Sequence, residues 1–124
     1  MRDPSNPVCR TISTLLSRIG DKWTVLVVTT LAEGPRRFNE LRRDIPSVSQ
    51  RMLTLTLRNL ERDGLVSRTV TPSIPPRVDY ALTQLGQSLQ KPITGLAQWA
   101  LDNVGAIHDA QAHFDAARDE SIAA

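Results

Sequence analysis

The sequence predicts a mainly α-helical protein with one small β-hairpin, an α+β fold. Over most of the 124 residues, apolar side chains recur at intervals of three and four. This is the spacing of amphipathic helices. Between residues 65 and 82 the pattern changes to alternation on either side of a proline-rich loop, which is typical of a hairpin.

Two helices are expected before Gly34. The first spans about Arg10–Ile19 and ends at Gly20, and Asp21 is suited to cap the second. The second is expected to bury one side. The apolar side of the first helix holds Ile12, Leu15, Leu16 and Ile19, and the buried side of the second holds Trp23, Leu26, Val27, Thr30 and Leu31.

A short third helix is expected after an extended piece at residues 36–38. Asn39 is suited to cap it, with Leu41 and Ile45 facing inward. Pro46 ends it, because the residue before a proline disfavours the α region.

A longer helix is expected from about Ser49 to Asp63, closed by a left-handed Gly64. At about 100° per residue it has two different sides. One side carries three leucines, and the other carries three arginines beside a threonine and a leucine. The leucines are Leu53, Leu57 and Leu60, the arginines are Arg51, Arg58 and Arg62, and the flanking residues are Thr54 and Leu55.

The arginine side has the chemistry that reads the major groove of DNA. Arginine binds guanine through two hydrogen bonds, glutamine pairs with adenine, and methyl groups meet thymine. The N-terminal end of such a helix enters the groove most deeply. The predicted base-reading residues are Ser49, Gln50, Arg51 and Thr54. The predicted phosphate contacts on this helix are Arg58 and Arg62.

The start of this helix leaves one alternative open. Ser47 is followed three residues later by Gln50, which fits a capping box. In that arrangement the Gln50 side chain folds back on the backbone and does not reach a base.

The hairpin strands are expected at Leu65–Val70 and Arg77–Leu82. The loop between them contains prolines, which lack the backbone N–H needed to continue the strand hydrogen bonds. Arg68 and Arg77 are expected to be neighbours, and like charges across strands repel. A DNA backbone or minor groove between them would relieve the repulsion, so both are predicted DNA contacts. A plain ribbon with solvated arginines is the alternative.

Thr83 is suited to cap a long final helix, which Pro92 is expected to kink. The apolar side of this helix is longer than one small domain can cover, which predicts a homodimer. That side holds Leu85, Leu89, Ile93, Leu96, Ala100, Val104 and Ile107. Residues 108–124 are interpreted as an acidic, alanine-rich C-terminal extension that forms a further short helix or frays.

Charge is unevenly distributed along the chain. Residues 34–70 contain eight arginines and four acidic residues, whereas residues 101–124 contain one arginine and five acidic residues. The middle of the chain therefore has the charge to attract phosphates. Arg36 and Arg37, at its start, are included among the predicted DNA contacts. Solvated surface charge is the alternative reading of this asymmetry.

Other classes of function have weak support. No apolar run reaches the ~20 residues of a membrane span, and the N-terminus lacks the apolar core of a signal peptide, so a cytoplasmic location is expected. His108 and His113 are not spaced to share one helix face at a metal, and no glycine-rich phosphate loop follows a strand. Cys9 has no histidine near it in sequence. We expect no metal, no cofactor and no enzymatic activity.

Several motifs occur in a recognisable order: Cys9, then GDKWT (20–24), GPRRFNEL (34–41), SVSQRML (47–53), LERDGLV (60–66) and PPRVDYALTQLG (75–86). This order resembles the HxlR branch of bacterial winged-helix regulators, which are relatives of the MarR group. The resemblance spans residues 9–107. It implies a winged helix-turn-helix domain with terminal dimerisation helices, in which residues 49–63 form the recognition helix and residues 65–82 the wing.

The resemblance also draws attention to the single cysteine. Many family members have Cys-Pro at this point, whereas this chain has Cys9 followed by Arg10. Some relatives use the cysteine to sense electrophiles or oxidants. A basic neighbour and a position near a helix start favour a reactive thiol. Cys9 is therefore a candidate redox sensor, and a buried, inert cysteine is the alternative.

Together these features predict a sequence-specific DNA-binding transcriptional regulator. The expected form is a homodimeric repressor on a palindromic double-stranded operator, with recognition helices about 34 Å apart. Redox, electrophile or small-molecule signals are the expected effectors. The alternative is a winged-helix module that binds protein and not DNA.

Overall fold

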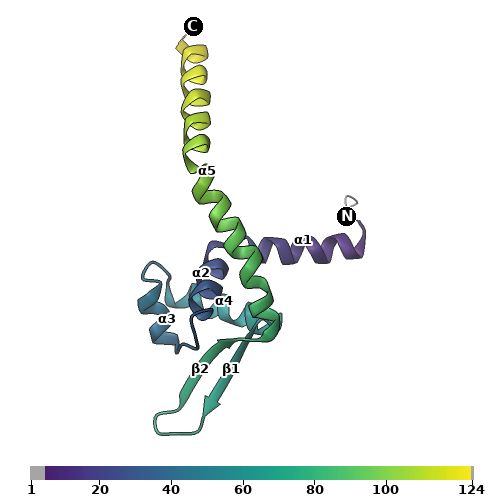
Figure 1. The fold of residues 1–124 in the computed structure, drawn as a ribbon, viewed down its shortest axis with the longest axis vertical. Helices are drawn as coiled ribbons and strands as arrows, with labels where there is room; N and C mark the ends of the chain where they lie inside the picture. The colour runs from purple at the N-terminus through teal and green to yellow at the C-terminus, as the bar shows by residue number, and fades with distance from the viewer. Residues whose placement is uncertain (1–4, 124) are drawn as a thin grey trace. The chain divides into compact units, whose positions relative to one another are not determined.

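The computed structural model describes residues 5–123 and has the predicted mainly helical fold with one antiparallel hairpin (Figure 1). The chain divides into two compact units, with the boundary between Gln90 and Lys91. The elements are α1 (Pro7–Ile19), α2 (Lys22–Leu31), α3 (Phe38–Asp44), α4 (Gln50–Arg62), β1 (Val66–Thr71), β2 (Arg77–Leu82) and α5 (Gln84–Ala123).

Helix α1 begins three residues earlier than predicted. The Asn6 side chain accepts a hydrogen bond from the Val8 N–H at 2.9 Å, and Pro7 occupies the first turn, where its missing N–H costs nothing. The middle of the apolar side of α1 is open to solvent within this chain, since Leu15 is 41% and Leu16 58% exposed, whereas Ile12 and Ile19 are half-buried.

Helix α2 is capped as predicted, because the Asp21 carboxylate accepts from the Trp23 N–H at 2.8 Å. Its buried side, however, is rotated from the predicted one. Leu26 is exposed, and the buried residues are Thr24, Val27, Val28 and Leu31. The helix is apolar almost all round between residues 23 and 28, so periodicity alone did not identify the side that packs inward.

The cap predicted for α3 is wrong by two residues. Arg37 occupies the capping position, and the Glu40 carboxylate accepts from its backbone N–H at 3.0 Å. This hydrogen bond, from the backbone of the capping residue to the side chain of the third helical residue, takes the place of the predicted Asn39 cap. Leu41 and Ile45 face inward as predicted and are 0% and 4% exposed.

Helix α4 lies where it was predicted, within one residue at each end. Leu53, Leu57 and Leu60 are at most 2% exposed and form the middle of the core with Leu41. Gly64 has a φ of +77°, the left-handed conformation that turns the chain from α4 toward β1.

The hairpin pairs its strands in a register that separates the two arginines. Arg68 lies opposite Tyr80, and Arg77 lies opposite Thr71. The predicted repulsion across the ladder is therefore wrong. Strand β1 begins and ends one residue later than predicted, which places Arg68 in its middle and leaves a five-residue loop at residues 72–76. The backbone of Arg36 adds a bridge to Tyr80, with N···O distances of 2.9 and 2.8 Å.

The start of α5 is fixed against the root of the hairpin. The Thr83 hydroxyl accepts from the Gly86 N–H at 3.1 Å and donates to the Gly64 carbonyl at 2.6 Å, which confirms the predicted cap. Gly86 lies so close to the residue before β1 that an added Cβ would be 2.1 Å from the Leu65 carbonyl oxygen. Only glycine fits there.

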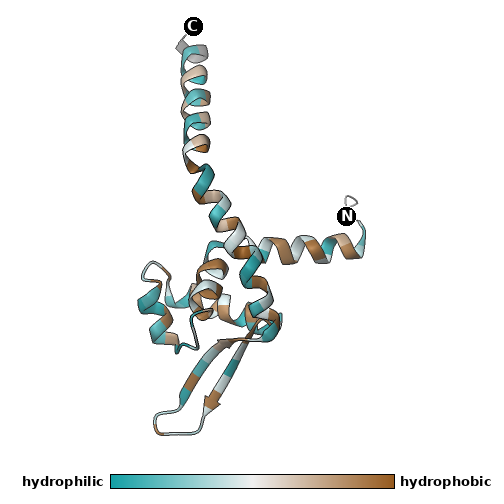
Figure 2. Ribbon diagram, viewed as in Figure 1, coloured by the Kyte–Doolittle hydropathy of each residue, from teal (hydrophilic) through white to brown (hydrophobic). Residues whose placement is uncertain are grey.

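Helix α5 runs through Pro92 and continues past residue 108 to Ala123 without a break, so the predicted short helix or fray is replaced by one long helix. Hydrophobic positions recur along both α1 and α5 (Figure 2). Past Lys91 several of these side chains are strongly exposed within this chain. They are Leu96, Trp99, Leu101, Val104, Ile107 and Phe114, which are 39–71% exposed.

Candidate nucleic-acid interface

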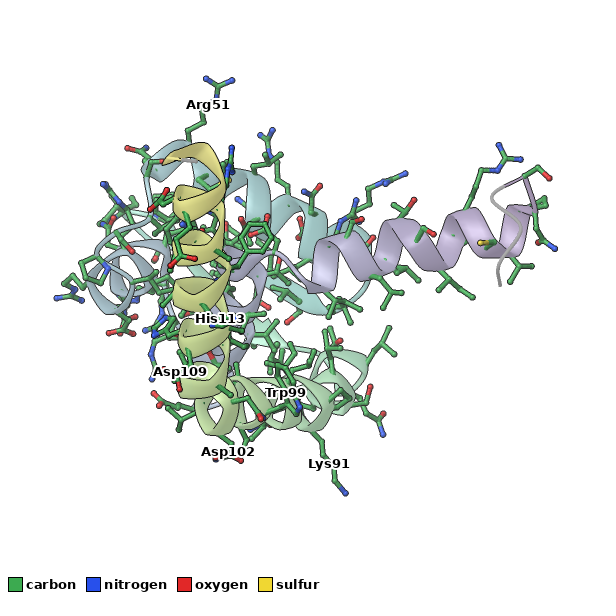
Figure 3. All side chains as sticks on the ribbon, turned by 90° about the horizontal axis from the view of Figure 1, so that it is seen from above. Arg51, Lys91, Trp99, Asp102, Asp109 and His113 are labelled. Carbon is green, nitrogen blue, oxygen red and sulfur yellow. The ribbon has the colours of Figure 1, made fainter. Side chains whose placement is uncertain are left out.

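The exposed side of α4 carries the arginines that were predicted to contact DNA. Arg51, Arg58 and Arg62 are all exposed, on the side opposite the three buried leucines. Figure 3 shows the Arg51 side chain reaching outward from the fold. Because its leucines are packed into the core, the helix presents these guanidinium groups from a rigid support.

The first turn of α4 decides between the two roles left open for Gln50. The Ser49 hydroxyl accepts from the Met52 N–H at 3.0 Å, so Ser49 and not Ser47 caps the helix. Gln50 is therefore the first helical residue and takes no part in a capping box. It is exposed, and its side chain makes no hydrogen bond within residues 5–123.

The second turn offers apolar groups beside Arg51. The Thr54 hydroxyl donates to the Gln50 carbonyl at 2.8 Å, which leaves its methyl group as the part available to a ligand. Leu55 is 51% exposed and lines the same surface hollow as Gln50, Arg51 and Arg58. Guanidinium, amide and methyl groups thus lie together on one helix face, which is the combination that base edges in the major groove recognise.

A second hollow, of about 530 Å³, separates α4 from the hairpin. Arg58 reaches it from α4 and Arg68 from β1, with Phe38 and Tyr80 also lining it. Glu61 is its one acidic lining residue. Two guanidinium groups from different elements make this hollow suitable for a phosphate, which arginine binds through charge-assisted hydrogen bonds.

Arg77, on β2, already has a partner in the protein. Its Nε lies 3.0 Å from a carboxylate oxygen of Asp79, and its side chain is 52% exposed. The ion pair reduces the charge that Arg77 offers to a ligand, although the exposed edge of the guanidinium faces solvent.

Arg36 and Arg37 have different surroundings. The Arg36 guanidinium donates to Glu33 and Asp44 at 3.3 Å and to the carbonyls of Gly34 and Pro35 at 3.0 Å, and its side chain is only 22% exposed. This arginine therefore connects the turn after α2 to the end of α3. Arg37, in contrast, is exposed.

Sequence reasoning gave no individual role to Arg42 and Arg43. Both lie exposed in the last turn of α3 and line one hollow with Arg37 and Asn39. Their presence in a cationic segment was visible in the sequence, but their convergence with Arg37 depends on the short helix that brings them together.

A long-range ion pair was also beyond sequence reasoning. Arg18, in the last turn of α1, pairs with Asp63, the residue that ends α4. Both side chains are mostly buried, with 20% and 14% exposed. The pair attaches the end of α4 to α1 across 45 residues of sequence.

Cys9 lies in the first turn of α1 and is 7% exposed. The neighbouring Arg10 guanidinium donates to the Ser5 carbonyl at 3.2 Å. Because the thiol is buried, reagents in solution have little access to it. This favours the alternative in which Cys9 is an inert, structural cysteine.

Two further kinds of site were searched for in the described part of the chain, a metal cluster and a membrane-spanning helix. Residues 5–123 contain no group of three histidine, cysteine or acidic side chains arranged to hold a metal ion. None of the described helices combines the length and the apolarity needed to span a bilayer.

The chain is similar to a known protein family over most of its length. Residues 18–108 match the HxlR-like helix-turn-helix family. An uncharacterised HTH-type transcriptional regulator of Methanothermobacter thermautotrophicus is 47% identical over 88 residues, which are 71% of this chain and 67% of that protein. The match to the family begins after Cys9.

Two solved structures extend the likeness to the fold. The redox regulator HypR in its reduced form aligns with a TM-score of 0.73 and 39% identity, over 80% of this chain and 98% of that one. Diamide-treated YodB from Bacillus subtilis aligns with a TM-score of 0.67 and 35% identity, over 78% of this chain and 96% of that one.

Proposed function

Because the chain belongs to the HxlR-like helix-turn-helix family, we propose that it is a sequence-specific, DNA-binding transcriptional regulator without catalytic activity. One observation supports this most directly: α4 is held by three buried leucines and exposes three arginines on its opposite side. Helix α4 is the recognition helix of this proposal, and the β1–β2 hairpin is the wing.

In the proposed complex, the start of α4 enters the major groove. Arg51 and Gln50 read base edges, and the Thr54 methyl group meets thymine. Ser49 stays in the base-reading set through its hydroxyl proton, although its oxygen is occupied by the helix cap. Arg62 contacts phosphate, as do Arg37 and the exposed edge of Arg77.

In the same complex, the hollow between α4 and the wing receives the sugar-phosphate backbone of the DNA strand that lies between the major and the minor groove. Arg58 on α4 and Arg68 on β1 both line it, so in this proposal both contact the same stretch of backbone. Arg36, by contrast, has four acceptors within the protein. Of the arginines predicted to contact DNA, it has the weakest support from the geometry.

We further propose that the regulator acts as a homodimer on a palindromic operator, as a repressor. The support is that α5 beyond Lys91 exposes six large apolar side chains and that α1, taken by itself, exposes Leu15 and Leu16. Large apolar side chains gathered on an exposed helix are typical of an interaction surface. A two-fold dimer would place its recognition helices about one DNA turn apart, roughly 34 Å.

Two observations support an effector. The first is the likeness to HypR, a redox regulator, and to YodB, whose structure was solved after diamide treatment. Cys9 is the one thiol with which this chain would respond similarly, and its burial means that a reagent would reach it only after α1 moves. The second is an apolar cavity of about 310 Å³ at the start of α5, lined by Leu15, Leu65, Leu85 and Leu89. Its size is at the lower limit of small-molecule sites.

Selection of bound duplexes from random DNA tests the proposal. The wild-type protein should enrich one symmetrical sequence, with an affinity that falls steeply with salt. Arg51→Ala should weaken binding to that sequence by about 1–3 kcal/mol and relax the preference at one base position. Arg118→Ala, which removes an exposed arginine from α5, is the matched control and should change neither.

The rival function is a winged-helix module that binds protein. No enrichment from random DNA even at low salt would favour that rival. A uniform loss of affinity for all sequences in Arg51→Ala would keep DNA binding but contradict the base-reading role of this arginine.

A further inference from the structure

Helix α1 buries little of its own surface within this chain. Apart from Cys9 none of its 13 residues is buried, and Leu15 and Leu16 are exposed. A hollow of about 370 Å³ lies between α1 and α4, and most of the side chains that line it are polar, including Thr14 and Asn59. The two helices are therefore not held together by a continuous apolar contact.

An ion pair joins α1 and α4 at their C-terminal ends. Arg18, in the last turn of α1, pairs with Asp63, and their side chains are mostly buried. Solvent and salt therefore screen this pair less than a surface pair. Replacing a buried ion pair by apolar residues is often neutral for stability, whereas removing one partner leaves the other charge uncompensated. The pair thus favours one arrangement of the two helices more than it raises the free energy of unfolding.

Asp63 lies at the point where the two proposed DNA-binding elements meet. Helix α4 ends there and β1 begins three residues later, so residues 63–65 form the turn between the recognition helix and the wing. Thr83 holds the same turn, because its hydroxyl donates to the Gly64 carbonyl at 2.6 Å and its N–H donates to the Leu65 carbonyl at 3.1 Å. The turn is therefore attached to α1 through Asp63 and to the start of α5 through Thr83.

The attachment to α1 matters for the proposed dimer, to which α1 contributes its exposed leucines. In a two-fold dimer each copy of α4 is related to the other by the symmetry axis of the interface. A contact that fixes α4 relative to an interface helix therefore also fixes the distance and angle between the two copies of α4. Palindromic operators read this distance as the spacing of their half-sites.

We propose that Arg18 is a positioning residue for DNA binding. Through Asp63 it holds the end of α4 on α1, and it thereby restricts the dimer to operators with one half-site spacing. Arg18 acts through the recognition helix and touches no DNA itself. This inference rests on the proposed DNA-binding function and on the proposed dimer.

The test compares three duplexes that differ only in their half-sites. The first carries the palindrome selected by the wild-type protein, the second has one base pair inserted at its centre, and the third has a single half-site. The insertion moves the half-sites apart by about 3.4 Å and rotates them by roughly a tenth of a turn. By fluorescence anisotropy, the wild-type protein should bind the intact palindrome about a hundredfold more tightly than the other two, because only there can both recognition helices engage.

Two variants break the ion pair from opposite sides. Arg18→Gln and Asp63→Asn should each reduce the preference for the intact palindrome over the spaced one to about tenfold or less, because α4 is then no longer held in one position on α1. Arg18→Lys keeps a cation opposite Asp63 and should retain most of the preference. The matched control is Arg10→Gln, which removes the same charge from an exposed position of the same helix and should retain all of it.

Half-site affinity separates positioning from folding. If Arg18 only stabilised the fold, Arg18→Gln would weaken binding to the half-site and to the palindrome by the same factor. In the positioning role, Arg18→Gln binds the half-site with wild-type affinity and loses affinity for the intact palindrome alone. Sedimentation equilibrium of the same variant should show unchanged self-association, so that the loss is not one of dimerisation.

Several outcomes would overturn the positioning role. One is a spacing preference that persists in both Arg18→Gln and Asp63→Asn. Another is an equal loss of affinity for half-site and palindrome, and a third is a loss in Arg10→Gln as large as in Arg18→Gln. A wild-type protein that binds both spacings equally would overturn it together with the proposed dimer. Failure of the wild-type protein to bind any duplex would overturn it together with the proposed DNA-binding function.

Discussion

Helix α4 and the part of α5 beyond Lys91 are both amphipathic, but they differ in what covers their apolar sides. The leucines of α4 are at most 2% exposed, whereas Leu101, Trp99 and Leu96 in α5 are 58–71% exposed. The core of one chain covers the first set. The second set is exposed within one chain, which is why we assign it to the proposed dimer. An amphipathic helix thus contributes to the core of one chain at α4 and, in our proposal, to the interface between two chains at α5.

The largest effect should come from removing a buried leucine of α4. Leu60→Ala should lower the free energy of unfolding by about 2–5 kcal/mol, because it leaves a cavity in a fully packed core. Chemical denaturation measures this decrease. Leu101→Ala is the paired control in α5 and should change stability by less than about 0.5 kcal/mol in dilute protein, as for an ordinary surface site. Equal decreases in the two variants would remove the distinction between the two helices.

The next largest effect should come from placing a charge on the exposed side of α5. Trp99→Asp should weaken the dimer by about 2 kcal/mol or more, since buried tryptophans are the strongest contributors to interfaces. Sedimentation equilibrium measures this. Gln111→Asp adds the same charge at an exposed polar position of the same helix and should leave association unchanged. A wild-type protein that is monomeric at micromolar concentration would contradict the proposed dimer.

The smallest effect compares two arginines of the DNA-binding unit. Arg58→Ala should reduce the slope of log affinity against log salt by about one for each phosphate that is no longer neutralised, with little change in stability. Arg36→Ala should instead reduce stability by about 1–2 kcal/mol, because four acceptors are deprived of a charged donor. Salt titrations and thermal unfolding of both variants measure the two effects. If Arg36→Ala changed the salt slope and left stability intact, this arginine would belong to the DNA-binding residues.

Local chemistry explains which parts of the fold were predictable. The ends of α4 were predictable because Ser49 and Gly64 act locally. The Ser49 side chain caps the start of the helix, and the left-handed conformation of Gly64 ends it. The start of α1 was missed because Asn6 and Pro7 precede the first apolar residue of the pattern, although an asparagine cap followed by proline is itself a signal of a helix start.

Other features depend on packing between distant segments. The inward side of α2 was ambiguous because apolar residues surround that helix, and only its neighbours select Thr24 and Val28. The separation of Arg68 from Arg77 depends on hairpin register, which moves a whole ladder when a strand end shifts by one residue. The enclosure of Arg36 and the pairing of Arg18 with Asp63 join segments that the sequence pattern does not connect.

The close approach at Gly86 has a mechanical consequence. With no side chain between them, the first turn of α5 and the backbone of Leu65 touch directly, and Thr83 ties the same turn to Gly64. A rotation of this turn about the axis of α5 therefore cannot be absorbed by side-chain rearrangement. The position of the root of the wing is therefore set by backbone contact with the first turn of α5, and any side chain added at Gly86 would force the two backbones apart.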